Sequence, residues 1–303
     1  MTASRLAPPA EVAFLGLGKM GSPMAAHLVS TGWKVRAFDL SPPALDAFVQ
    51  ANPRALRATS AAGAAAGAAA VVTMLPDGKS VRKALVDAGA AAALGRGGVV
   101  VEMSSSAPMD TRRLGEDLAA LGVGMVDAPV SGGVKRAVDA KLAIMAGGDA
   151  ALVERCRPLL AAMGSTIHAT GPLGSGHAMK ALNNYVSAAG LVAVSEALLV
   201  GRRFGLDPAL MVDVLNSATG KNNTTELKAK QFMLSGTFAS GFSLALMAKD
   251  LRTAADLAEH LGVAAPLSRT ISALWTDAEG ALGPASDHTE MFRFLEMLGD
   301  RNR

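Results

Sequence analysis

The sequence predicts an α/β domain built on a parallel, doubly wound sheet, followed by an all-α domain. Short runs of β-branched residues alternate with helical patterns through the first half of the 303 residues. A glycine-rich G-x-G-x-x-G segment follows the first of these runs. Beyond about Gly171 the strand pattern stops and only helical periodicity continues. We therefore expect an α/β domain over residues 1–172 and a helical domain over residues 173–303.

Seven short apolar runs in the first half are strand candidates. Helical stretches separate most of them, as in a sheet whose parallel strands are joined by crossover helices. The alanine-rich segment 61–70 lies between two of these runs. Because alanine favours helix, we interpret this segment as a crossover helix in preference to a disordered linker. The expected strands are 12–16, 34–39, 71–75, 98–103, 124–129, 142–148 and 166–170.

The second half has the apolar spacing of amphipathic helices throughout. Two of the expected helices begin at a proline, Pro208 and Pro266, which is tolerated in a first helical turn. The segment "SATGKNNTTE" at 217–226 connects two helices; its Lys221, Asn222 and Asn223 could contact a polar substrate, or the segment could be a solvated loop. The expected helices are 175–203, 207–217, 244–262, 266–281 and 288–298.

The composition argues against several classes of protein. The net charge is +3 with basic residues scattered along the chain, and aromatics are 4% of residues, so nucleic-acid binding is not expected. No apolar run reaches the ~18 residues of a membrane span, and the N-terminus lacks the apolar core of a signal peptide. Cys156 is the single cysteine, which favours a reducing, cytoplasmic setting. The histidines lack metal-ligand spacing, so no metal is expected. The sequence contains no G-x-S-x-G nucleophile elbow, which argues against a hydrolase.

The glycine-rich segment predicts a dinucleotide site. Gly16 permits a tight turn, Gly18 lets the backbone approach a pyrophosphate, and Gly21 lets the following helix pack on the strand. The free N–H groups at the helix N-terminus would face the phosphates. Leu17 and Met20 lie in the same turn and are further candidates for cofactor contact. The first domain is therefore expected to be of the Rossmann type.

Asp39 is the candidate for choosing between the two nicotinamide cofactors. It ends the second expected strand, 23 positions after Gly16, close to the ~20 of the dinucleotide fingerprint. A carboxylate there can accept hydrogen bonds from ribose hydroxyls and repels a 2′-phosphate, which favours NAD over NADP. Two alternatives stay open at this point: Asp39 could simply cap the next helix, and Arg36 could lie near the ribose.

Lys180 is the candidate for acid/base chemistry. It is the only Asp, Glu, Lys or Arg between Arg157 and Glu196, and its apolar neighbours would partly desolvate it and favour the neutral amine. Asn184 follows one helical turn later and shares its face. The structural alternative is a lysine whose stem packs on the helix while its ammonium reaches solvent.

Two further motifs contain polar groups suited to ligand binding. Ser131, Gly132 and Gly133 follow an expected strand and could cradle a small anion such as a carboxylate, or could form a plain turn. Lys249, in "MAKDL", is the first charged residue after Lys230 and could serve an interdomain ion pair.

Together these motifs resemble those of the β-hydroxyacid dehydrogenase family, which includes 3-hydroxyisobutyrate dehydrogenase and tartronate semialdehyde reductase, with 6-phosphogluconate dehydrogenase a more distant relative. The motifs "FLGLGKMGSPMAAHL", "TMLPDG", "DAPVSGG", "GSGHAMKALNN" and "MAKDL" follow the family order and span residues 12–251. Two departures stand out. Glu102 occupies the position of the aspartate in the family's D-x-S-[ST] motif. Ala140, Lys141 and Leu142 replace a Gly-Thr-Leu sequence, which puts the local loop shape in question.

The resemblance implies a role for each matching residue. Lys180 matches the catalytic lysine and Asn184 its polar partner. Ser131, Gly132 and Gly133 match the substrate-binding loop, with Ser131 also counted among the catalytic residues. The implied cofactor contacts beyond the glycine loop are Leu75, Pro76, Ser105 and Lys249.

The implied activity is reversible hydride transfer between NAD and a small 3-hydroxy acid such as 3-hydroxyisobutyrate, yielding the semialdehyde, with Lys180 as general acid/base. Alternatives are reduction of tartronate semialdehyde, succinic semialdehyde or sulfolactaldehyde, an imine reductase, and a non-catalytic scaffold that keeps the fold. Lys180 and Asp39 argue against an imine reductase, and Lys180 with the intact "DAPVSGG" motif argues against a scaffold. By analogy with the family, the chain is expected to form a homodimer or homotetramer.

Overall fold

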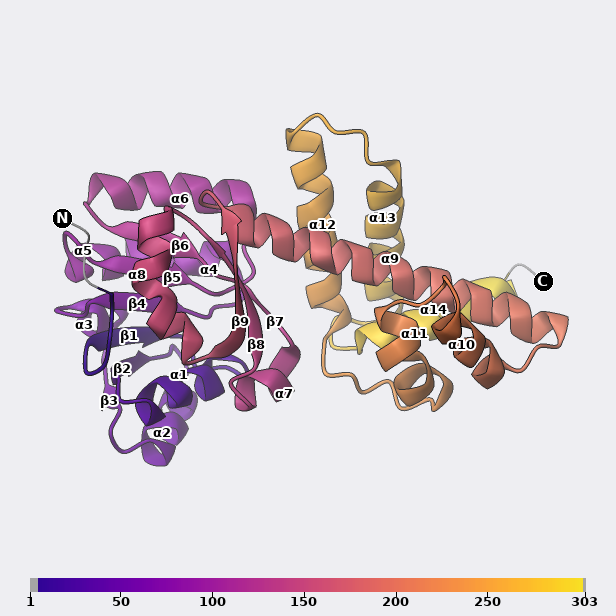
Figure 1. Ribbon diagram of the computed structural model, residues 1–303, viewed down its shortest axis with the longest axis horizontal. Coiled ribbons are helices and arrows are strands. Elements are labelled where there is room, and N and C mark those ends of the chain that lie inside the picture. Colours follow the sequence, from indigo (N-terminus) through magenta and orange to yellow (C-terminus); the bar gives the residue numbers. More distant parts are fainter. Residues whose placement is uncertain (1–4, 302–303) are drawn as a thin grey trace. The chain divides into compact units, whose positions relative to one another are not determined.

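The structure, a computed structural model, describes residues 5–301 (Figure 1). By its internal contacts the chain divides into two compact units, the first ending at Lys180 and the second beginning at Ala181. Helix α9 (Ser175–Phe204) runs through this boundary, so the division into residues 1–172 and 173–303 stays a prediction.

The first unit is built on one sheet, which contains nine strands within residues 5–301. The strand order is β3-β2-β1-β4-β5-β6-β8-β7, with β9 pairing to β8. The six strands from β3 to β6 in this spatial order pair in parallel, in the order of a dinucleotide-binding sheet, as predicted. The bounds are β1 Glu11–Leu15, β2 Lys34–Phe38, β3 Leu56–Arg57, β4 Ala70–Thr73, β5 Val99–Glu102, β6 Gly124–Asp127, β7 Val130–Ser131, β8 Leu142–Gly147 and β9 Gly164–Gly171.

The sheet is parallel, as predicted, except at one side. Strand β8 pairs antiparallel with both β6 and β7. The chain returns from β7 to β8 through the short helix α7 (Gly133–Val138), which is too short for a crossover to a parallel position. The two-residue strands β3 and β7 were not predicted, because two residues give no alternation to detect.

Both faces of the sheet are covered, as its sequence of near-continuous apolar strands requires. In β1, Val12 and Phe14 belong to the apolar cluster on one face, whereas Ala13 and Leu15 belong to the cluster on the other. The helices of this unit are α1 Gly21–Ser30, α2 Pro42–Ala51, α3 Ala61–Ala65, α4 Gly78–Arg82, the π-helix η1 Lys83–Asp87, α5 Ala90–Leu94, α6 Pro108–Ala120, α7 and α8 Ala150–Ala161.

The alanine-rich segment forms a shorter helix than its composition suggests. Helix α3 begins after Ser60, whose hydroxyl accepts a hydrogen bond from the Gly63 N–H, and ends at Ala65. Its residues Ala61, Ala64 and Ala65 are buried against the sheet. The crossover helix is therefore confirmed, with small side chains that allow close packing.

The second unit is helical, as predicted, and its largest core cluster surrounds Trp275. The segment 217–226 contains an unpredicted short helix, α11, capped at Asn222 by its side chain, and Lys221 pairs with Glu226 at 3.0 Å. The helices are α9, α10 Pro208–Ser217, α11 Asn223–Leu227, the π-helix η2 Ala229–Leu234, α12 Leu244–His260, α13 Pro266–Leu282, the 3₁₀ helix η3 His288–Glu290 and α14 Met291–Arg301.

Helix α9 is long and apolar enough to cross a membrane, although no span was predicted from the apolar runs of the sequence. Its 30 residues include a window of mean hydropathy 1.4, of which 44% is buried inside the protein. A core helix of a soluble protein meets the same criteria, so this single helix is weak evidence for a membrane span.

The turn after α7 explains the departure at Ala140. Its N–H bonds to the Ala137 carbonyl at 3.3 Å, and the next N–H, of Lys141, bonds to the Arg136 carbonyl at 2.8 Å, which is the Schellman pattern. Ala140 has φ 53°, the left-handed conformation that favours glycine. The loop thus has the shape that glycine would give it, with an alanine in a strained position.

Replacing Ala140 with glycine is expected to stabilise the protein by about 0.5–1 kcal/mol, because the strain of a left-handed alanine outweighs the added freedom of the unfolded chain. Urea denaturation of the whole protein measures this change. The matched control is Ala137→Gly within α7, which is expected to destabilise. An unchanged or lowered midpoint for Ala140→Gly would contradict the prediction.

Candidate active site

The glycine loop after β1 has the geometry of a phosphate-binding turn. Gly16 has φ 101°, and a side chain there would collide with the backbone of Met74. A side chain on Gly21 would collide with the Gly16 carbonyl, so this glycine lets α1 start close to the strand. Gly18 is exposed, and nothing lies within 4 Å of the position a Cβ would take. The backbone at Gly18 is therefore open to a phosphate group.

Asp39 lies at the end of β2 and faces the same loop. Its carboxylate accepts hydrogen bonds from the Leu17 N–H at 2.6 Å and the Ser41 N–H at 2.7 Å. One lone pair on each oxygen remains for a ribose hydroxyl. Arg36 instead pairs with Glu11 at 2.6 Å and donates to the Ala66 carbonyl, so its guanidinium is already engaged.

The loops after β4 and β5 meet beside the glycine loop. The Leu75 N–H donates to the hydroxyl of Ser104 at 2.9 Å, which joins the two loops. Pro76 is exposed and Ser105 is half-buried. Ser105 is the residue predicted to contact the cofactor, and the role of Ser104 in joining the loops was not predicted, because adjacent serines in "SSS" give no signal that tells them apart. The residues of these loops fit a dinucleotide: an open glycine turn, a carboxylate one strand away and polar loops between them.

Lys180 lies next to the predicted substrate loop. Its half-buried Nζ donates a hydrogen bond to the Val130 carbonyl at 2.8 Å, immediately before Ser131. Gly132 and Gly133 follow with φ of 131° and 66°, and both are exposed. The structure therefore brings the lysine and this loop together within the first unit.

Two further predicted residues lie in the second unit. Asn184 is buried, and its Nδ2 donates to the Asp250 Oδ2 at 2.6 Å. The Nζ of Lys249 lies 3.7 Å from the other oxygen of Asp250. Asp250 thus connects α12 to α9, an anchor that the sequence motif "MAKDL" contained but that we had not assigned.

A buried polar cluster at the ends of β5 and β6 was also missed. Glu102 and Asp127 are neighbours across these strands, and the ring of His177, in the first turn of α9, lies between their carboxylates. Nε2 lies 2.8 Å from Glu102 Oε2, and Nδ1 lies 3.6 Å from Asp127 Oδ2. The signal in the sequence was an acidic residue at the carboxyl end of two successive strands.

The contact between Glu102 and His177 favours the charged form of both side chains. Burial by itself lowers the pKa of His177, but the charge and hydrogen bond of Glu102 outweigh it, and the pKa is raised. Burial likewise raises the pKa of Glu102, but His177 and Ser104 outweigh it, and the pKa is lowered. Neither this cluster nor any other group of three His, Cys, Asp or Glu side chains within residues 5–301 is arranged to hold a metal ion.

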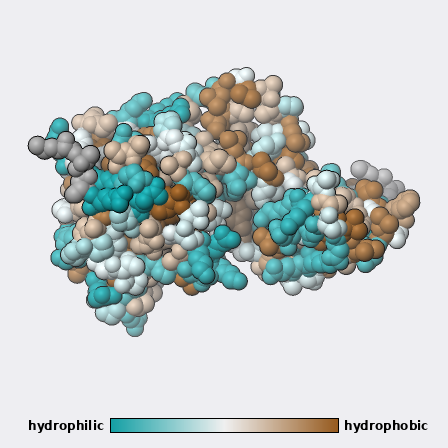
Figure 2. All heavy atoms as spheres, in the orientation of Figure 1, coloured by the Kyte–Doolittle hydropathy of each residue, from teal (hydrophilic) through white to brown (hydrophobic). Residues whose placement is uncertain are grey.

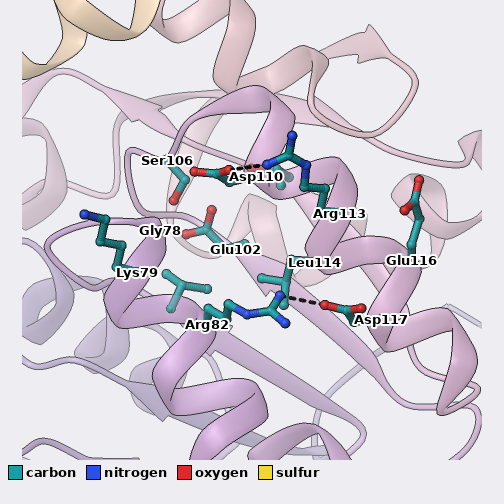
Figure 3. A pocket seen from close by; sticks show the side chains of 12 residues that line it. Gly78, Lys79, Arg82, Glu102, Ser106, Asp110, Arg113, Leu114, Glu116 and Asp117 are labelled. Carbon is teal, nitrogen blue, oxygen red and sulfur yellow. Dashed lines mark hydrogen bonds and ion pairs between the residues drawn. The ribbon is translucent and has the colours of Figure 1, made fainter.

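A cavity of about 560 Å³ lies between α4 and α6, and Glu102 and Ser106 are among the residues that line it (Figure 3). Its rim contains two ion pairs, Arg82 with Asp117 at 2.6 Å and Arg113 with Asp110 at 3.7 Å. Neither Lys180 nor the 131–133 loop lines this cavity. Because its charges largely compensate one another and the chemistry-bearing residues lie elsewhere, we do not assign the substrate to it.

Comparisons with known proteins identify the family. Residues 11–171 match the NAD-binding domain of 6-phosphogluconate dehydrogenase, and residues 174–295 match the NAD-binding domain of NADP-dependent 3-hydroxyisobutyrate dehydrogenase. The chain belongs to the β-hydroxyacid dehydrogenase family. It is 37% identical to 3-hydroxyisobutyrate dehydrogenase of Pseudomonas aeruginosa, over 85% of this chain and 88% of that protein.

Two further proteins are similar to this chain over nearly its whole length. The dehydrogenase is 36% identical to 3-sulfolactaldehyde reductase of Escherichia coli, over 90% of this chain and 91% of the relative. It superposes with a TM-score of 0.87 on 3-hydroxyisobutyrate dehydrogenase of Mycobacterium tuberculosis solved with L-serine, at 35% identity over 94% of this chain and 99% of that one. The family, the fold and the use of a nicotinamide cofactor are thereby confirmed.

Proposed function

We propose that this dehydrogenase interconverts a small 3-hydroxy acid and its semialdehyde, with 3-hydroxyisobutyrate the leading candidate and Lys180 as the general acid/base. The observation that carries the proposal is the 2.8 Å hydrogen bond from Lys180 Nζ to Val130, which places an amine beside the loop of Ser131, Gly132 and Gly133. An amine next to an anion cradle is the pair of groups that oxidation of a hydroxy acid needs.

The proposed reaction assigns one task to each group. The substrate carboxylate binds to the Ser131 hydroxyl and the amides of Gly132 and Gly133. Neutral Lys180 takes the hydroxyl proton as the C–H bond breaks, and protonated Lys180 returns it in the reduction direction. Asn184, one turn further along α9, hydrogen-bonds the reacting oxygen or the lysine. When bound, the nicotinamide supplies hydride chemistry that no side chain can provide.

NAD is the proposed cofactor in preference to NADP. The carboxylate of Asp39 supports this, because it is fixed by two backbone N–H groups at the position where a 2′-phosphate would meet a negative charge. Gly16, Leu17, Gly18, Met20 and Gly21 form the proposed pyrophosphate turn, and Leu75, Pro76, Ser105 and Lys249 are proposed as further contacts.

The substrate is tested by NAD reduction across 3-hydroxyisobutyrate, glycerate, threonate, 4-hydroxybutyrate and a sulfonated 3-hydroxy analogue. We expect the highest kcat/KM with a three-carbon 3-hydroxy acid. A preference for the sulfonate would instead favour the activity named for the Escherichia coli relative. Activity with cyclic imines alone, or with no compound despite cofactor binding, would overturn the proposal.

We also propose that the protein is a cytoplasmic homodimer or homotetramer. Its single cysteine, Cys156, is buried in α8, where burial raises the pKa of the thiol to about 12.

The end of α9 and α10 expose Val200, Phe204, Leu210 and Val214, and Figure 2 shows apolar surface on this unit. Such patches are typical of protein interfaces. A monomeric mass in sedimentation equilibrium would contradict this assignment.

A further inference from the structure

The first turn of α9, which precedes Lys180, is held by buried charges. Glu102, Asp127 and His177 are exposed by only 1%, 0% and 1%. The two oxygens of Asp127 accept hydrogen bonds from the N–H groups of Gly174 and His177, both at 2.8 Å. A carboxylate thus satisfies free N–H groups at the start of the helix, where the helix dipole also favours negative charge.

The contacts of the His177 ring favour a proton on both nitrogens. Nδ1 lies 2.8 Å from the hydroxyl of Thr111, which can donate its own proton to the Ala107 carbonyl at 3.1 Å and accept from the ring. Nε2 faces the Ser104 carbonyl at 3.3 Å and the carboxylate of Glu102 at 2.8 Å. Ring nitrogens that face a carboxylate, a carbonyl and a hydroxyl able to accept favour an imidazolium paired with ionised Glu102.

The backbone beside this ring is closely packed. A side chain on Gly176, beside His177, would collide with the Met145 carbonyl and the backbone of Asp127, and one on Gly147 would collide with Asp127 and Ser175. The first turn of α9 therefore packs directly on the ends of β6 and β8. Lys180 follows His177 by three residues, so its direction of emergence depends on how this turn is seated.

We propose that His177 and Glu102 are positioning residues for Lys180: their buried ion pair fixes the first turn of α9 and so sets the place of the lysine amine beside the 131–133 loop. This inference rests on the proposed function. Beyond that function, the inference states that kcat depends on His177 and Glu102, which do not contact the substrate. Breaking one partner of such a pair leaves an unpaired buried charge or acceptor, which displaces the turn.

The test compares His177→Gln, Glu102→Gln, the double variant and a control, Thr73→Val. Thr73 is the neighbour of Glu102 on β4, is equally buried, and its hydroxyl has no hydrogen-bond partner within residues 5–301. Each single variant is expected to lower kcat at least tenfold while the Kd of NADH stays within threefold, because misplacement of a reacting group costs up to ~10²-fold. The double variant should lose at most threefold more than the worse single variant, and Thr73→Val less than twofold.

A second readout is independent of turnover. Lys180 in the single variants should be reductively methylated at least threefold faster than in the wild type, as measured by mass spectrometry, while the exposed Lys141 reacts at an unchanged rate. If His177→Gln does not fold, Glu102→Asp withdraws the carboxylate by one methylene while keeping its charge, and the same losses are expected. Folded His177→Gln or Glu102→Asp protein with kcat within twofold of the wild type would overturn the inference. Normal turnover by a Lys180 variant would overturn the proposed function instead.

Discussion

Replacing Lys180 with methionine is expected to lower kcat about 10³-fold, because general acid–base catalysis contributes roughly 10²–10⁴ and methionine carries no proton. The side chain has a similar length, so packing in the first turns of α9 is largely kept. The Kd of NADH, measured by fluorescence, should change less than threefold, since the lysine lies beside the 131–133 loop and not beside the glycine turn.

The matched control is Lys141→Met. Lys141 is exposed and lies at the end of the α7 turn, so its replacement removes the same charge near the same loop. We expect its kcat to remain within twofold of the wild type. If both variants turned over equally well with the best substrate, Lys180 would have no acid/base role and the proposed mechanism would fail.

Replacing Asp39 with serine is expected to lower the selectivity for NAD over NADP at least 100-fold, measured as the ratio of kcat/KM values. A unit charge about 4 Å from another is worth about 4 kcal/mol near a protein surface, and each 1.36 kcal/mol is a factor of ten. Part of the change is loss of affinity for NAD, because serine cannot accept both backbone hydrogen bonds that hold the carboxylate against Leu17 and Ser41.

Asp46→Ser is the control for this charge change. Asp46 lies on α2 and pairs at the surface with Arg57, away from the glycine loop. Its replacement should alter both kcat/KM values by less than twofold. An Asp39→Ser protein that still excluded NADP would show that selectivity comes from other residues of the loop.

The sheet could be predicted because its strands carry a repeated signal. Buried parallel strands such as β4 and β5 are continuous apolar runs, and glycines mark the turn after β1. Antiparallel pairing of β8 could not be predicted, because it depends on how far a six-residue helix moves the chain and not on the composition of the strand. Helix α11 was missed for a similar reason: its stability comes from the cap at Asn222 and not from apolar periodicity.

Residues of the candidate site could be predicted where they belong to a sequence motif. They could not be predicted where their place in the site depends on a contact with residues distant in the sequence. Lys180 stands out in an uncharged stretch, and the structure gives it a neighbour in the predicted loop. His177 lies in the same stretch but looked like one scattered histidine, because its partners Glu102 and Asp127 are 75 and 50 positions away in the sequence. Long-range pairing of this kind leaves no local pattern.

The burial of Cys156 has a practical consequence for spectroscopy. A thiol that is fully enclosed and has a pKa of about 12 offers almost no thiolate to maleimides or nitroxide reagents near neutral pH. The chain without added cysteines is therefore expected to take up almost no label. A pair of introduced surface cysteines, one in each compact unit, would carry fluorophores or spin labels without a competing site. Distances between those labels, measured with and without cofactor and substrate, would then give the separation of the two units in solution.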